Sequence, residues 1–361
     1  TEEKAALVII DVQDCFLDEG TRSGLPGSLS VGNSYPIIGV INSLKEKSCL
    51  FDLVIKTADF HPPNHTSFAA SHGVVEYYNA GGGGITLTCV RSSGGSMSEA
   101  ACCPKWNSTG DSFECLDRSA GCPVQGAASD PNHNPACILC RNLPEQCFEM
   151  KQMMWPRHCV QKNPDGSEGD WQFARDLESF SNEDGTLNEI IVNIGKYPYV
   201  DSYSAFMDNT KQLKTELDSV LKAQGISTLY LTGLATDFTV QWTVQDALAL
   251  GYKVNLITDG VKGLYLDQTL GTYEEQNDRQ LALFESWGVQ LVTSAQVLDL
   301  QCNESVIPLG NGNDNDPRGA SGRGPRGSGS AAVAPSLCFA LSSVLVAIFF
   351  SAVSGDFRLR V

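Results

Sequence analysis

Basic residues are scarce in this chain of 361 residues: 25 Lys and Arg stand against 42 Asp and Glu, which gives a formal net charge of −17. Nucleic-acid binding needs a positively charged face, so the composition excludes that class of partner. No signal peptide is visible, because the chain opens at Thr1 and runs almost directly into an apolar stretch; we expect that it was removed or never present. Apolar residues reach 42%, which excludes a wholly disordered chain.

The body of the chain, from residue 1 to about 300, alternates short apolar runs with amphipathic stretches. The apolar runs are unbroken and rich in β-branched residues, as is typical of buried parallel strands. They cover residues 5–10, 51–55, 189–194, 226–231, 252–257 and 289–292. Helical patterns lie between them, at 36–47, 209–224, 238–250 and 273–286. The alternation predicts an α/β fold, a doubly wound parallel sheet with helices on both faces.

Ligands of such sheets bind beyond the carboxyl ends of the strands. Asp11, Asp59 and Lys196 each follow a predicted strand, and so does the turn at 233–239. We therefore expect these residues on the functional edge of the sheet.

One segment, at about 74–152, shows no strand or helix period and is rich in cysteine. Its eight cysteines are an even number, which predicts four disulfides, a stapled surface insertion and an oxidising compartment. They are Cys89, Cys102, Cys103, Cys115, Cys122, Cys137, Cys140 and Cys147. The alternative is that Cys137 and Cys140 form half of a zinc site, although no second pair is well spaced.

The C-terminal part differs in composition from the predicted main domain, residues 1–302. Residues 303–330 are rich in Gly, Asn, Asp, Ser and Arg, which predicts a flexible linker. Residues 331–353 then carry no charge, so we expect the segment 331–361 to be membrane-directed. It is either a cleaved GPI signal or a single spanning helix with Arg358 and Arg360 on the cytoplasmic side. Both alternatives place the main domain on the extracellular face of the membrane or in the secreted fraction.

A carboxylate and two imidazoles directly follow the second predicted strand, as Asp59, His61 and His65. At this spacing they can converge on one cation, and the ligand types suit Zn, Mn or Fe(II). The alternative is a loop with a capping Asp and exposed His. His158 is a fourth ligand candidate. Asp11, at the end of the first strand, is a candidate general base or a cap of the following turn.

Several long motifs now add up to a resemblance. ALVIIDVQDCF, TADFHPPNHTSFAASHG, MMWPRHCVQ, DSYSAF and GLATDFTVQWTVQDALALGYKVNLITDG resemble the nicotinamidase and pyrazinamidase branch of the isochorismatase-like hydrolases, in order and over residues 1–73 and 153–300. The resemblance implies an isochorismatase-like fold, one divalent metal and hydrolysis of nicotinamide to nicotinate and ammonia by an Asp–Lys–Cys triad.

The resemblance also assigns roles residue by residue. It places the catalytic aspartate at Asp11 and the metal ligands at Asp59, His61 and His158, with His65 matching a ligand of some members. The residues that it assigns to the substrate pocket are Phe16 and Trp155 against the ring, Tyr203, and Ala235. The family's cis peptide falls between Leu234 and Ala235, and the oxyanion donors would be the N–H groups of Ala235 and Thr239.

Two triad members are replaced in this chain. The position of the nucleophilic cysteine is Thr239, and the position of the lysine is Ile194. A threonine hydroxyl is much harder to ionise than a thiol, and Ile194 removes the ammonium that would stabilise the anion. Lys196 stands two residues away as a possible substitute.

Two functions follow. The first is a metal-dependent nicotinamidase with weak activity. The alternative is a cell-surface pseudoenzyme that binds a pyridine-like ligand, or a protein partner through the Cys-rich insertion.

Overall fold

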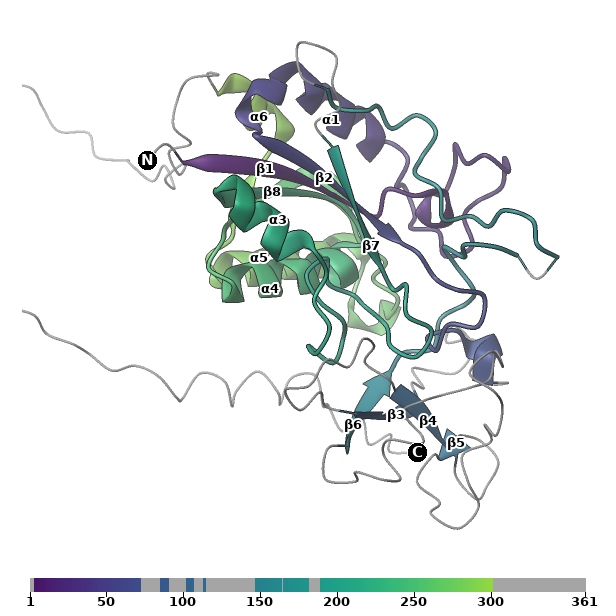
Figure 1. Ribbon diagram of the computed structural model, residues 1–361. Helices are drawn as coiled ribbons and strands as arrows, with labels where there is room; N and C mark the ends of the chain where they lie inside the picture. The colour runs from purple at the N-terminus through teal and green to yellow at the C-terminus, as the bar shows by residue number, and fades with distance from the viewer. Residues whose placement is uncertain are drawn as a thin grey trace, which may run out of the picture. The chain divides into compact units, whose positions relative to one another are not determined.

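Six parallel strands form the central sheet, in the order β10-β9-β8-β1-β2-β7 (Figure 1). Their bounds are β1 Lys4–Ile10, β2 Leu53–Asp59, β7 Glu189–Ile194, β8 Ile226–Leu234, β9 Lys253–Lys262 and β10 Gln290–Val292. Each of the six predicted apolar runs overlaps one of these strands, although β2 begins and ends later than the run at 51–55, and every neighbouring pair is parallel. The predicted α/β sheet is therefore confirmed.

This computed structural model describes residues 3–72, 85–90, 102–106, 113–114, 147–163, 165–181 and 189–300. The chain divides into two compact units, residues 1–310 and 311–361, and all described residues belong to the first. The predicted linker and apolar C-terminal segment lie outside the described residues. Among those that are described, no helix has the length and apolarity to cross a membrane.

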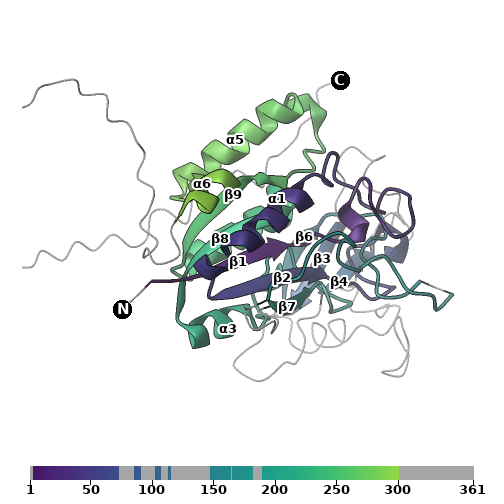
Figure 2. The same ribbon diagram turned by 90° about the horizontal axis from the view of Figure 1, so that it is seen from above.

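Helices cover both faces of the sheet, as predicted (Figure 1). One face carries α1 (Ile37–Ser43) and α6 (Ser294–Asp299), and the view from above shows α1 lying across the sheet (Figure 2). The opposite face carries α3 (Leu217–Gln224), α4 (Gln241–Ala249) and α5 (Tyr273–Ser286). Two separate apolar clusters, one on each face, form the core.

Strand β1 shows why the apolar runs are unbroken. Successive side chains of a strand point to opposite faces. Leu7 and Ile9 pack with α1 and α6, whereas Val8 and Ile10 pack with α3, α4 and α5. All four are completely buried, so beyond the exposed Lys4 a polar side chain in β1 would need a buried partner.

The helix predicted at 209–224 is shorter than expected, because α3 begins only at Leu217. The Asp208 carboxylate accepts hydrogen bonds from the backbone N–H groups of Gln212 (3.0 Å) and Leu213 (3.3 Å) and from the Thr210 hydroxyl (2.8 Å). These local bonds replace the first helical turns.

The expectation that residues 74–152 contain no strands is wrong. The structure forms a four-stranded sheet there, in the order β5-β4-β3-β6 and antiparallel throughout. The strands are β3 Ile85–Val90, β4 Cys102–Trp106, β5 Phe113–Glu114 and β6 Cys147–Gln152. Each is short, which gives the sequence pattern little period to show. The pairing of the eight cysteines lies outside what is described.

A buried ion pair fastens β7, the edge strand, to β2. The Lys56 Nζ lies 2.8 Å from the Glu189 Oε1, and both side chains are buried. The same Glu189 oxygen accepts the backbone N–H of Phe180 at 2.5 Å. Removing either charge would leave the other one buried and unpaired, which strongly destabilises a folded protein.

We predict that Lys56→Met lowers the free energy of unfolding by about 3 kcal/mol, because it leaves an unpaired buried carboxylate. The double variant Lys56→Met/Glu189→Gln should recover most of this loss, since the glutamine oxygen still accepts the Phe180 N–H. Urea unfolding of the parent, Lys56→Met, Glu189→Gln and the double variant measures both effects. A double variant no more stable than Lys56→Met would contradict the prediction.

Candidate metal centre and ring pocket

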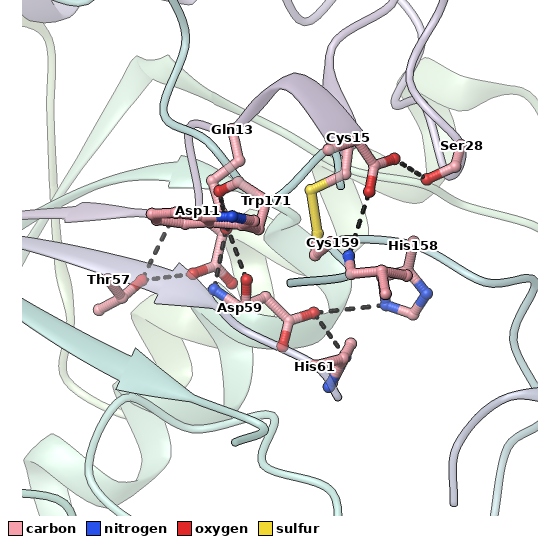
Figure 3. Close-up of a disulfide and its surroundings, with 12 residues drawn as sticks. Asp11, Gln13, Cys15, Ser28, Thr57, Asp59, His61, His158, Cys159 and Trp171 are labelled. Carbon is pink, nitrogen blue, oxygen red and sulfur yellow. Dashed lines mark hydrogen bonds and ion pairs between the residues drawn. A yellow bond between two sulfur atoms is a disulfide. The ribbon is translucent and has the colours of Figure 1, made fainter. Parts of the chain in front are cut away.

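Three metal-ligating side chains meet at the carboxyl edge of the sheet. Asp59 is the last residue of β2, His61 follows it closely, and His158 comes from the segment after β6. The Asp59 Oδ2 lies 2.9 Å from the His61 Nε2 and 3.3 Å from the His158 Nε2 (Figure 3). The ligand atoms of all three lie within 4.8 Å of one another and all three residues are buried.

The two imidazoles bond to backbone carbonyls through Nδ1, so their Nε2 atoms face Asp59 from the side on which a metal would bind. The His61 Nδ1 lies 2.9 Å from the Gly195 carbonyl oxygen, and the His158 Nδ1 lies 2.7 Å from that of Pro156. A carbonyl only accepts, so each Nδ1 carries the proton. The Asp59 Oδ1 is buried with no hydrogen-bond partner among the described residues. Donor types, orientation and this orphan oxygen together fit a divalent metal.

Gln13 holds the backbone of Asp59 in place, at the start of the loop that carries the candidate ligands Asp59 and His61 (the metal loop). Its Nε2 donates to the Asp59 carbonyl at 2.8 Å, and its Oε1 accepts the Asp59 N–H at 2.9 Å (Figure 3). Gln13 is not among the residues predicted from the sequence. The available signal was an amide side chain directly after a fully buried strand, where it must find buried partners.

His65 lies beside this group but is held differently. Its ring stacks on His61 with centroids 4.0 Å apart. Its Nε2 lies 3.2 Å from the Val200 carbonyl oxygen and its Nδ1 2.7 Å from the Ser67 hydroxyl, so both nitrogens are engaged. His61, His65 and Asp201 form a second buried group of ligand-type atoms. Asp201 is not among the site residues predicted from the sequence.

The buried charges at this edge shift one another's pKa values. Burial alone would raise the pKa of Asp59, but His61 and His158 outweigh it and hold that pKa well below the ordinary range. Burial lowers the pKa of His61, but the Asp59 carboxylate outweighs burial and raises that pKa to about 9. Burial, followed by the charge of His61, lowers the pKa of His65 well below its usual range. Without a metal, Asp59 and His61 thus form an ion pair.

Asp11 and Thr239 lie together next to this group. Asp11 is fully buried, and its Oδ1 accepts the Thr57 hydroxyl at 2.5 Å. Burial and the nearby charge of Asp59 raise the pKa of Asp11 to about 8, while the hydroxyls of Thr57 and Thr239 lower it. Its Oδ2 has no hydrogen bond of good geometry within the described part of the chain.

The two candidate positions for the lysine are separate from this pair. Ile194 is buried in the core cluster that packs on α3, α4 and α5. The Lys196 Nζ lies 5.6 Å from the centre of the Tyr197 ring. Lys196 lines a small cavity with Ile194 and Asp208, whereas Thr239 lines the cavity of the metal group.

Aromatic side chains form a pocket over the metal group. Trp155 packs edge-to-face on Phe238 at 5.0 Å, and its Nε1 donates to the Tyr203 hydroxyl at 3.0 Å. The Gln152 Nε2 donates to the same hydroxyl at 3.1 Å and to the Asp201 Oδ2 at 2.9 Å. The cavity is lined by Phe16, Leu29, Asp59, His61, Trp155, His158, Asp201, Ser202, Tyr203, Ala235, Phe238, Thr239 and Leu264. Gln152 and Phe238 were not identified from the sequence.

The turn after β8 completes the pocket. The peptide bond between Leu234 and Ala235 is cis, as the resemblance implied. A π-helical turn, Thr236–Val240, follows and leads into α4. This turn brings Ala235 and Thr239 into the same cavity as the metal group.

Comparisons with known proteins agree with this arrangement. An isochorismatase domain family matches residues 133–298. The nicotinamidase of Escherichia coli is 30% identical over 259 residues, covering 72% of this chain and 83% of that protein. The nicotinamidase of Acinetobacter baylyi is 27% identical over 293 residues, covering 81% of this chain and 94% of its own length. The chain belongs to the nicotinamidase branch of the isochorismatase-like hydrolases.

Solved structures show the same nicotinamidase-branch fold. The nicotinamidase/pyrazinamidase of Acinetobacter baumannii superposes with a TM-score of 0.50 at 27% identity, covering 82% of this chain and 98% of that one. The yeast nicotinamidase superposes with a TM-score of 0.52 at 21% identity over 80% of this chain and 99% of its own, which supports the fold alone.

The raised pKa of Asp11 makes stability depend on pH. A carboxyl with a higher pKa in the folded than in the unfolded state favours folding at pH below about 4, and this contribution is lost as pH rises through about 8. In EDTA, the free energy of unfolding of the parent should therefore fall as the pH rises from 5 to 8, whereas Asn at position 11 cannot titrate. We predict that the free energy of unfolding of Asp11→Asn, relative to that of the parent, rises over this pH range by on the order of a few kcal/mol. Urea unfolding at the two pH values measures the difference. An identical pH dependence in both proteins would refute it.

Proposed function

We propose that this domain binds one divalent metal and a flat pyridine carboxamide, and that it lacks the rapid hydrolysis of a cysteine-dependent nicotinamidase. The observation that carries the proposal is the pair of replacements in an otherwise complete pocket. Thr239 stands at the nucleophile position beside Asp11, and the position of the family's lysine is a buried isoleucine, Ile194.

Asp59, His61 and His158 would hold the metal, of which Zn, Mn and Fe are the candidates. When bound there, a divalent metal supplies a Lewis acid facing the ligand. Phe16 and Trp155 would lie against the ring, and Tyr203 holds the Trp155 indole in place through its hydroxyl. The curated relatives are nicotinamidases, which supports a pyridine carboxamide as the ligand.

The two replacements act on the same chemical step. A thiol is ionised readily next to a cation, whereas a threonine hydroxyl needs a base acting directly on it. Loss of the nucleophile costs roughly 10⁶ in rate in enzymes of this kind of chemistry. Binding depends on the metal and the aromatic walls, which remain.

A second candidate function is slow hydrolysis with Thr239 as the nucleophile. It is favoured by the contact between the Thr239 hydroxyl and the Asp11 carboxyl, whose pKa of about 8 is suited to a base. The Thr239 oxygen would attack the carbonyl carbon as Asp11 takes its proton. Ammonia would leave with that proton, and water would then hydrolyse the ester and return the hydroxyl.

The location and remaining organisation of the chain are also proposals. We propose an extracellular domain, residues 1–302, attached to a membrane through the segment 331–361. The buried disulfide Cys15–Cys159 supports an oxidising compartment. A protein partner would bind the Cys-rich insertion, whose last strand reaches the pocket through Gln152.

Nicotinamide binding and ammonia release by the zinc-loaded full chain test the main proposal. We expect calorimetric binding that His158→Ala abolishes together with zinc binding, and turnover roughly 10⁶-fold below that of a cysteine-bearing relative. Turnover that is measurable and disappears in Thr239→Val, with zinc still bound, would instead establish the threonine mechanism. Absence of binding in a zinc-loaded protein would reject both.

The replacements can also be reversed. We predict that Thr239→Cys and Ile194→Lys each restore little ammonia release, and that the double variant restores more than the sum, because triad members act as a unit. Zinc content and thermal unfolding serve as controls for the buried lysine. A folded, zinc-loaded double variant with no gain would show that the pocket has diverged beyond the triad.

A further inference from the structure

The disulfide between Cys15 and Cys159 joins two segments that each contribute to the pocket (Figure 3). Cys15 immediately precedes Phe16, and Cys159 immediately follows His158. Both cysteines are completely buried, and 144 residues separate them along the chain. The bond therefore ties a metal-ligand candidate to an aromatic wall of the pocket.

The backbone of Cys159 adopts an uncommon conformation. Its φ is 47°, in the left-handed region that residues other than glycine seldom occupy. Its carbonyl oxygen accepts the His61 N–H at 3.1 Å, and the next N–H, of Val160, donates to the Asp170 Oδ1 at 3.1 Å. Asp170 also accepts the Cys15 N–H with its own carbonyl oxygen, at 3.1 Å. The disulfide thus completes a closed set of contacts that runs from Cys15 through Asp170 and Val160 to Cys159.

The His158 imidazole depends on the position of its segment. Its Nδ1 bonds to Pro156, two residues earlier, so this bond moves with the segment and does not place the ring relative to Asp59. The Phe16 ring lies 5.7 Å from the His158 ring, on the segment that follows β1. The disulfide is the covalent link between the two rings' segments.

We propose that the Cys15–Cys159 disulfide is a positioning brace of the metal site: it holds the His158 imidazole at ligand distance from Asp59 and keeps Phe16 against it. The inference rests on the metal-binding part of the proposed function. Because both sulfurs are fully buried, reductants reach the bond only when the segments separate, which makes it a permanent brace rather than a thiol switch. Loss of groups that orient a ligand costs about 10- to 100-fold in metal affinity.

Zinc affinity of the full chain, measured by competition with a chromophoric chelator, tests the brace. We expect Cys15→Ala/Cys159→Ala to bind zinc about tenfold or more weakly than the parent, and its Co²⁺ absorption spectrum to change in intensity, which reports ligand geometry. Cys15→Val/Cys159→Ala, which restores apolar volume without the bond, should behave likewise. Ile41→Ala, a buried change in α1, serves as the control for lost stability and should leave zinc affinity unchanged.

The outcomes separate the two proposals. A parent protein that binds no zinc overturns the metal site and the brace together. A parent that binds zinc, with unchanged affinity and Co²⁺ spectrum in the folded disulfide variants, overturns the brace alone.

A measurement on the parent keeps the test decisive if the variants do not fold. Linkage is reciprocal, so a bond that strengthens zinc binding must itself be strengthened by zinc. Peptide mapping after phosphine reduction should show zinc protecting Cys15–Cys159 more than the disulfide of Cys49, the internal control. Equal protection of both bonds overturns the brace.

Discussion

The Asp59 carboxylate is the group on which the arrangement of the site depends. Its backbone is held at both polar atoms by Gln13, and its side chain faces His61 and His158. Its charge raises the pKa values of Asp11 and His61. A buried carboxylate is tolerated only where opposite charge compensates it, so the two imidazoles, or a metal between them, are a condition of the fold at this edge.

The parallel sheet explains how such distant residues come together. Strands β1, β2, β7 and β8 all end at the same edge, which brings Asp11, Asp59 and the turn after β8 together, while Ile194 pairs with Asp59 at the end of β7. His158 arrives from outside the sheet, on a segment that the insertion separates from β2. Hydrogen bonds to the metal loop and the disulfide to Cys15 hold it there. The sheet therefore places Asp11 and Asp59, whereas hydrogen bonds and a disulfide place His158.

The framework does not depend on residues 194 and 239, the positions at which the family resemblance expects a lysine and a cysteine. Ile194 belongs to the apolar core, and Thr239 lines the same cavity as Ala235 and Phe238. Asp59, His61 and His158 and the aromatic walls of the cavity are held by contacts that involve neither Ile194 nor Thr239. Burial, followed by the charge of Asp59, raises the pKa of Asp11 to about 8.

The apolar pattern predicts the central sheet, and the motifs predict most of the residues at the site. Unbroken apolar strands need burial on both faces, as in a parallel sheet covered by helices. The pattern alone therefore predicts the six strands, the parallel sheet and the edge at which the site lies. Motif spacing predicted Asp59, His61 and His65 as candidate ligands, the family resemblance added His158, and the structure brings Asp59, His61 and His158 together. The short strands of the insertion, the ion pair of Lys56 with Glu189, the clamp of Gln13 and the Cys15–Cys159 bond could not be read in this way. Each joins groups far apart in the chain, and only tertiary packing decides which distant partners meet.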